Sequence, residues 1–336
     1  SDKDRNVEIE KLKEQVKESL PILKNNLLNE LIQGNSILDQ EKVIEKLQYL
    51  NIDILSEYYQ VAIIEIDNED NFAWSQEDKG LWKFAVSNIV KEFFADSFKL
   101  EVFNDSSEKI CLIIGHGNTR EDGLCSNIEV IFEQLKEIVE EYLKFTITIG
   151  IGNIKKDMCD ISVSYREALV ALKNSIVLGN NKVIPYSSIS ESNLTGSVYS
   201  IEYKSQLLMD MRISNIDDAS KQISQIFKEI KSRNISFELL FVICIEMIST
   251  CFEFIAEAGY TTTDIFKEDQ SDIIRKLQVI KNICEMENYI KGIFIATINY
   301  VKKNKTSKSA KLIEEVKTYI NNNYDNSELN INELSN

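Results

Sequence analysis

The chain contains few of the residues that break helices and few of those that most often perform acid–base catalysis. Its 336 residues include 2 Pro, 11 Gly and a single His. Because proline and glycine mark turns, their scarcity argues against a loop-rich all-β protein and favours a helix-rich one. The length is too great for one small core and suits two or three domains.

Basic residues are fewer than acidic residues. The chain has 38 Lys and Arg against 54 Asp and Glu, which gives a formal net charge of −16. An acidic surface repels phosphate backbones, so we expect that this segment does not hold DNA well by itself. Its one local basic cluster runs from Lys302 to Lys311, and we interpret that cluster as a solvated linker.

Membrane and metal signatures are missing as well. We find no uninterrupted apolar run long enough to span a bilayer and no opening signal peptide, so we expect a cytoplasmic protein with no membrane contact. The strongly apolar segment 237–258 includes Glu246 and Glu253, which indicate a buried core helix. The cysteines form no C-x-x-C pair, so we expect reduced thiols and no metal finger. They are Cys111, Cys125, Cys159, Cys244, Cys251 and Cys284.

Between about residues 55 and 188, strand and helix patterns alternate. Branched apolar runs and period-two alternation predict strands, whereas apolar residues at three- and four-residue spacing predict helices. The expected strands are 59–66, 99–103, 109–114, 145–150 and 182–186, and the expected helices are 81–94, 128–143 and 164–173. The order β-α-β-β-α-β-α-β predicts an α+β fold, a mixed sheet with helices on one or both of its faces.

The N-terminal residues predict a helix over 4–34 that ends at Gly34-Asn35, with a kink or break near Leu20 because Pro21 interrupts it. Its apolar stripe leaves two interpretations open. The helix packs on its own domain, or it is a connector that pairs with a second copy. The stripe consists of Ile9, Leu12, Val16, Leu20, Leu23, Leu27 and Leu31. A second amphipathic helix is expected over 39–50.

Beyond residue 200 the pattern is helical. We expect helices over 201–211, 219–230, 237–258 and 272–301, then a polar linker at 306–309. A further amphipathic helix follows from Leu312 to Asn322, and Leu329 to Leu334 begins another.

The segment Ser164–Lys173, with Tyr165, Ala168, Leu169 and Leu172 on one helical face, is followed by Gly179 and a short strand at Val183. This ending resembles the close of a GGDEF-type nucleotide-cyclase domain, in the degenerate form found inside large bacterial AraC-type transcription regulators. The resemblance implies a degenerate GGDEF-like α+β domain in the middle of a gene regulator.

The hairpin turn decides between an enzyme and a non-enzyme within that resemblance. Active diguanylate cyclases carry Gly-Gly-Asp/Glu-Glu-Phe there, but this chain has Asn104-Asp-Ser-Ser-Glu108. Asp105 and Glu108 have the composition of an ordinary solvated hairpin. Glu65 or Asp67 loosely matches the metal-binding acid at the end of the first strand. Two-metal chemistry needs several converging carboxylates, so we expect no catalytic, cofactor-binding or metal residues and no cofactor.

Three other features have ordinary interpretations. His116, in Gly115-His-Gly117, is interpreted as a lone histidine in a surface loop, because no nucleophile or metal ligand lies at a recognisable spacing. Gly150-Ile-Gly152 is too short for a phosphate loop and should simply end a strand. The aromatic residues Tyr58, Tyr59, Phe72 and Trp74 either line a small-molecule pocket or pack at an edge, and we favour edge packing.

The C-terminal segment carries a second resemblance. Ile313-Glu-Glu-Val-Lys-Thr-Tyr-Ile-Asn-Asn-Asn-Tyr324, with Leu329-x-Ile331-x-Glu333-Leu334, resembles the opening of an AraC-type DNA-binding domain. The chain stops before a recognition helix appears. The resemblance implies that the intact protein binds DNA through a C-terminal domain that this chain lacks. Regulators of this layout often carry a receiver domain upstream, and residues 4–34 look like the helix that follows one.

The expected organisation has four parts: a helical connector at 1–35, the degenerate GGDEF-like α+β domain at 36–190, an all-α domain at 191–303, and the linker with the truncated DNA-binding start at 304–336. The hypothesis is a non-catalytic relay, as a homodimer, between an upstream input and DNA binding. The alternative is a sensor that binds a nucleotide or small metabolite without turnover. A cyclase is a third, less favoured hypothesis.

Overall fold

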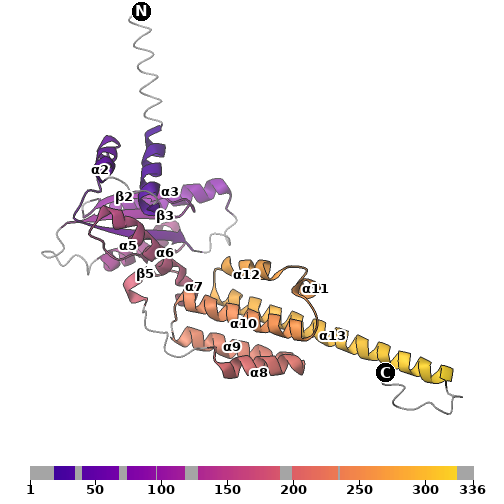
Figure 1. Ribbon diagram of the computed structural model, residues 1–336. Coiled ribbons are helices and arrows are strands. Elements are labelled where there is room, and N and C mark those ends of the chain that lie inside the picture. The colour runs from indigo at the N-terminus through magenta and orange to yellow at the C-terminus, as the bar shows by residue number, and fades with distance from the viewer. Residues whose placement is uncertain are drawn as a thin grey trace, which may run out of the picture. The chain divides into compact units, whose positions relative to one another are not determined.

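The chain folds into two compact units, residues 1–192 and 193–336, in the computed structural model (Figure 1). The structure describes residues 19–34, 40–67, 74–95, 97–117, 128–189, 199–233 and 235–323.

The first unit is built on a five-stranded sheet with strand order β2-β3-β1-β4-β5. All neighbours pair antiparallel except β4 and β5, which are parallel. The strands are β1 (Tyr58–Ile66), β2 (Lys99–Asn104), β3 (Ile110–His116), β4 (Ile147–Ile151) and β5 (Val183–Pro185). The predicted order of strands and helices, with an apolar central strand and a β2–β3 hairpin, is confirmed.

Helices cover both faces of this sheet (Figure 1). Alternate residues of the central strand separate the two cores: Val61 and Ile63 lie in one, and Ala62 and Ile64 in the other. The first core takes a helix over 19–33, α2 (Gln40–Tyr49) and α6 (Ile161–Lys173). The second takes α3 (Gln76–Phe94) and α5 (Ile128–Leu143). Shorter helices are η3 (Met158–Asp160), α7 (Ser175–Leu178) and η4 (Tyr186–Ser188).

Helix α3 begins five residues before its predicted start. Ser75 accepts a hydrogen bond from the Asp78 main chain, and the Asp78 carboxylate accepts one from Ser75, which forms a capping box. This exchange satisfies main-chain donors that the first helical turn leaves open. The start of the helix is therefore set by a polar signal that precedes the apolar stripe.

Glycines allow α6 to lie directly on β4. A Cβ atom at Gly150 would come within 2.3 Å of the Ala168 carbonyl oxygen, and one at Gly152 within 2.1 Å of the Ser164 carbonyl oxygen. Gly150 lies inside β4, so its role is close packing, and it does not merely end the strand.

The described part of the N-terminal helix packs largely on its own domain. Leu27, Leu28, Leu31 and Ile32 are buried in the first core, whereas Ile22 and Leu23 are exposed. Gly34, at φ 65°, follows the last helical turn as predicted. Pro21 lies within the helix over 19–33. The stripe residues Ile9, Leu12 and Val16 fall outside the described residues, as does Asp39, the first residue of the expected helix 39–50.

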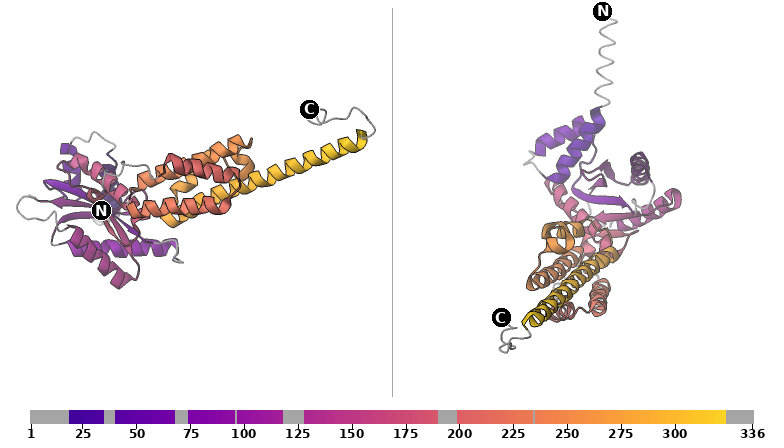
Figure 2. Two further views of the ribbon diagram at one scale, coloured as in Figure 1. Left: turned by 90° about the horizontal axis from the view of Figure 1, so that it is seen from below. Right: turned by 90° about the vertical axis from the view of Figure 1, so that its right-hand side faces the viewer.

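The second unit is all-helical in its described part. Its helices are α8 (Ile201–Arg212), α9 (Ile216–Arg233), α10 (Phe237–Glu257), α11 (Thr262–Phe266), α12 (Gln270–Gln278) and α13 (Ile283–Asn323). Figure 2 shows α13 running past the other helices of its unit. Helix α10 is long and apolar enough to cross a membrane. It packs against α8 and α13, with Met247 and Cys251 buried, which is the arrangement of a core helix.

Two sequence-based expectations for this unit are wrong. The expected helix 272–301 is interrupted between Gln278 and Ile283, and the expected linker at 306–309 lies inside the 41-residue helix α13. The linker residues are polar, but no Gly or Pro follows Gly292, so nothing stops the helix there. The segment 329–334 lies outside the described residues.

Candidate functional site

The β2–β3 turn is closed by a buried carboxylate. Oδ1 of Asp105 accepts hydrogen bonds from the main-chain nitrogens of Ser107, at 2.8 Å, and Lys109, at 2.9 Å. Its Oδ2 accepts one from the Tyr165 hydroxyl of α6, at 2.8 Å. The side chain of Asp105 is therefore used inside the fold and ties the hairpin to a helix on one face of the sheet.

The expectation of a solvated turn is wrong for Asp105 and right for Glu108, which is exposed. Burial, followed by the hydrogen bond to Asp105 and the charge of that carboxylate, raises the pKa of the Tyr165 phenol above its usual range. A phenol with a raised pKa stays protonated and continues to donate. The link between the turn and α6 therefore persists at neutral pH.

The two acids at the end of β1 also have internal partners. The Glu65 carboxylate lies 2.6 Å from the ammonium group of Lys109, the residue that directly precedes β3. Lys109 thus contacts two acids, Glu65 through its side chain and Asp105 through its main chain. This ion pair neutralises Glu65 and holds its carboxylate toward the hairpin.

Asp67 is buried and points to the opposite neighbour, β4. Its carboxylate accepts hydrogen bonds from the hydroxyls of Thr146, at 2.8 Å, and Thr148, at 2.6 Å. The main chain of Asn181 donates a third, at 2.9 Å. Burial raises the pKa of the Asp67 carboxyl, and these hydrogen bonds oppose the rise. Asp67 therefore joins β1, β4 and the loop that leads to β5.

The three acids at this end of the sheet already have partners within the fold. Mg²⁺ at phosphoryl-transfer sites is usually bound through one or two available carboxylates, together with water and substrate phosphates. Here Glu65, Asp67 and Asp105 each accept from internal donors. Within the described ranges, no cluster of three or more His, Cys, Asp or Glu residues is placed to hold a metal ion. The sequence pointed to these three acids but gave no sign of their partners.

His116 is not in a surface loop, which corrects the prediction. It ends β3 and is buried, with its Nε2 3.0 Å from Oε1 of Gln60. The Gln60 amide nitrogen donates to the Gly152 carbonyl, so its oxygen is left to accept from His116. Burial lowers the pKa of His116 to about 4. A neutral, buried imidazole that is hydrogen-bonded to Gln60 is a structural group, because a substrate cannot reach it.

Of the aromatic residues near β1, Trp74 packs against the edge of the second core, whereas Tyr59 is buried in the first core. Trp74 meets Phe145 edge to face, with ring centroids 5.5 Å apart, and lies 5.8 Å from Trp82. This packing agrees with the favoured interpretation for Trp74. Phe72 lies outside the described residues.

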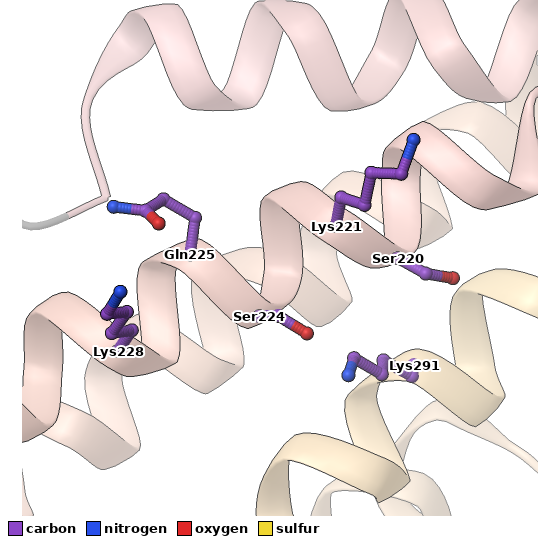
Figure 3. A pocket seen from close by; sticks show the side chains of 6 residues that line it. All are labelled: Ser220, Lys221, Ser224, Gln225, Lys228 and Lys291. Atoms are coloured by element: carbon purple, nitrogen blue, oxygen red, sulfur yellow. The ribbon is translucent and has the colours of Figure 1, made fainter.

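A shallow hollow of about 310 Å³ lies between α9 and α13 in the second unit (Figure 3). The hydroxyls of Ser220 and Ser224 lie on the side of α9 that faces Lys291, whereas Lys221 and Lys228 point away from it. Lys221 pairs with Asp218, and Lys291 pairs with Glu287. Open, largely neutralised surface of this kind gives no converging set of ligand-binding groups.

Comparison with known proteins agrees with the architecture. A family model described as a GGDEF-like domain matches residues 33–173, which is less than half of the chain. These residues form a GGDEF-like fold. A search of curated proteins found no match.

Solved structures match as well, among them two cyclase-type domains. One is the GGDEF domain of DgcB from Caulobacter crescentus in complex with c-di-GMP: identity 17%, TM-score 0.32, covering 39% of this chain and 79% of that one. The other is the active GGEEF domain of a diguanylate cyclase from Vibrio cholerae: identity 15%, TM-score 0.31, covering 43% and 88% respectively. Similarities this low carry no argument about function.

Proposed function

We propose that this chain is a non-catalytic signal-relay segment of a bacterial DNA-binding transcription regulator. Its GGDEF-like domain serves as a scaffold that passes a conformational change toward a C-terminal helix-turn-helix domain of the AraC type. In this proposal the protein works in the cytoplasm as a homodimer, and an upstream receiver domain supplies the input.

The observation that carries the non-catalytic part is the inward use of the acids at the hairpin end of the sheet. Asp105 is bound by Tyr165, Glu65 by Lys109, and Asp67 by two threonine hydroxyls. Releasing any one of them for a cation would leave a buried donor or an ammonium group without its partner. Such a loss costs roughly 1–3 kcal/mol at the buried Asp67 and Asp105, and about 0–1 kcal/mol at the partly exposed Glu65–Lys109 pair. The same bonds make the domain a stiff body, as a relay requires.

The relay part draws support from α13. Its first half lies in the core of the helical unit, where Met286, Ile290 and Phe294 are buried. The same helix continues without interruption to Asn323, into the segment that resembles an AraC-type opening. A continuous helix transmits a shift or rotation along its axis better than a flexible linker does. The DNA-binding part rests on that sequence resemblance alone.

The experiment uses the full-length natural protein. Genomic DNA fragments that bind the purified protein are captured and sequenced. The same protein preparation is screened with nucleotides in a thermal-shift assay. The proposal expects enrichment of specific DNA and no nucleotide-dependent shift. A sensor would shift: a ligand at a hundred times its dissociation constant adds about 2.7 kcal/mol to the free energy of unfolding. Failure to enrich any DNA would contradict the regulator assignment.

A further inference from the structure

A groove of about 510 Å³ runs beside β2 in the first unit. Its floor is the end of that strand, residues 101–104, and its walls are the helix over 19–33 and α3. The α3 residues in the lining recur at three- and four-residue steps, so they form one stripe along the helix. They are Gly80, Lys83, Phe84, Ser87 and Lys91. The groove is therefore elongated, with a strand as its base.

The strand at the base is an edge strand of the sheet. The Asp105 nitrogen donates to the Lys109 carbonyl at 2.9 Å, and pairing then alternates along the hairpin, so Phe103 exchanges hydrogen bonds with Cys111. Even-numbered residues of β2 thus turn their main-chain groups away from β3. Asn104 fits this register, because its carbonyl accepts from the Asn29 amide at 3.0 Å.

Val102 is the next residue along β2 whose main-chain groups point away from β3. No described residue is recorded as a hydrogen-bond partner of its main-chain N–H or C=O, and both point toward the groove side of the strand. An edge with unpaired groups is a template for another strand. At Gly80 on the α3 wall, an added Cβ would meet nothing within 4 Å, so the groove is open there.

The walls carry positive charge on a protein whose net charge is −16. Lys83 and Lys91 project from α3, and the charge of Lys91, like that of Lys24, acts on Glu101 at the base of the groove. Lys24 stands on the opposite wall and donates to the Asn51 carbonyl. Glu101 is the one acid in the lining. The local balance therefore favours an anionic occupant.

We infer that this groove binds an extended acidic segment of a partner protein, which adds to the free edge of β2 as a sixth strand between Lys83, Lys91 and Lys24. Strand addition takes affinity from main-chain hydrogen bonds and specificity from the flanking side chains. A second copy of the sheet is disfavoured because this edge is recessed between two helices. The inference is independent of the relay proposal.

The first test is fluorescence anisotropy with a fluorescein-labelled acetyl-Glu-Val-Asp-Val-Glu-Val-amide peptide. We expect saturable binding that falls at least about tenfold in the Lys83→Glu, Lys91→Glu double variant. Lys173→Glu, on an exposed position of α6 outside the groove, should change binding less than about twofold. Gly80→Phe fills the groove and should abolish binding while the protein stays folded. The inference is overturned if the acidic peptide does not bind. It is also overturned if a peptide with Lys in place of each Glu and Asp binds equally well.

The second test separates strand addition from simple charge attraction. In hydrogen–deuterium exchange, the peptide should slow exchange of the Val102 amide about fivefold or more. A peptide that is N-methylated at alternate residues keeps its charge but lacks the N–H groups that would donate to β2. It should bind at least about tenfold more weakly. Undiminished binding of the N-methylated peptide, or protection absent from β2, overturns the inference. Displacement of the peptide by equimolar inorganic tripolyphosphate would instead indicate a small-anion site.

Discussion

The Tyr165 hydroxyl donates a 2.8 Å hydrogen bond to Oδ2 of Asp105, a residue 60 positions earlier in the chain. This bond fastens the β2–β3 turn to α6. The other oxygen of the same carboxylate holds the turn's own main chain. One buried side chain thus fixes both the internal geometry of the hairpin and its position against the helix.

Tyr165→Phe should lower the free energy of unfolding by roughly 1.5–3 kcal/mol, because a buried carboxylate loses a charge-assisted hydrogen bond. Urea unfolding measures the loss. In a cycle with Asp105→Asn, the two substitutions should be strongly non-additive, since each removes part of the same interaction.

Tyr142→Phe is the matched control for this prediction. Tyr142 lies on α5 and its side chain is largely exposed. Its loss should change stability by less than about 0.5 kcal/mol. Equal effects at Tyr142 and Tyr165, or additive effects at Tyr165 and Asp105, would mean that the bond contributes little.

Gly150→Ala should destabilise the domain by more than about 2 kcal/mol. The new methyl group would meet the Ala168 carbonyl and the Leu172 main chain at 2.3 and 2.6 Å, so α6 must move off β4. Gly80→Ala is the counterpart, where the methyl group meets nothing and the helix gains about 0.5–1 kcal/mol. Thermal unfolding of both variants checks the opposite signs. A tolerated Gly150→Ala would contradict the close packing of α6.

Acidification should destabilise the first unit through His116. Its pKa is about 4 in the folded protein, against an ordinary value of 6.5, so between these values only the unfolded chain takes up the proton. The contribution is complete above pH 6.5 and is lost progressively as the pH falls toward 4, up to ~3 kcal/mol. Urea unfolding at several pH values measures this slope.

His116→Gln keeps a donor for Gln60 but does not titrate. The pH slope of its stability between 6.5 and 4 should therefore be flatter than that of the unchanged protein. The comparison is needed because Asp67, whose pKa is raised, acts with the opposite sign at the acid end. Parallel slopes for the two proteins would show that His116 does not stay neutral in the fold.

The homodimer proposal depends on the N-terminal stripe. Ile22 and Leu23 are exposed on the described part of this helix, although Leu20 still packs on the first core. Replacing Leu12, Val16 and Leu23 by Lys should convert a dimer to a monomer in analytical ultracentrifugation, because charges at a helix seam are not buried. Lys173→Glu serves as a surface control. An unchanged mass in the triple variant would remove the basis for this dimer.

The arrangement of the first unit could be predicted because its strongest signals are local. Branched apolar runs gave β1 and β3, turn residues gave the hairpin, and helical spacing gave α5 and α6. Each of these patterns is contained within about twenty residues. The same reasoning found the apolar core helix α10.

The sequence could not reveal partners that only the fold brings together. Asp105 looks like a solvated turn residue until Tyr165, from a distant helix, closes on it. His116 is flanked by two glycines and looks like a loop, but pairing with β1 buries it beside Gln60. The polar stretch 306–309 has the composition of a linker, but it contains no Gly or Pro, and helix α13 continues through it.

The most direct test of the central claim is turnover. The protein is incubated with GTP and Mg²⁺, or Mn²⁺, and the products are separated by chromatography beside an active diguanylate cyclase as a positive control. Because Glu65, Asp67 and Asp105 are held by internal partners, the account predicts no cyclic dinucleotide above the level of a no-protein blank. Cyclic dinucleotide formed in proportion to protein concentration would contradict it.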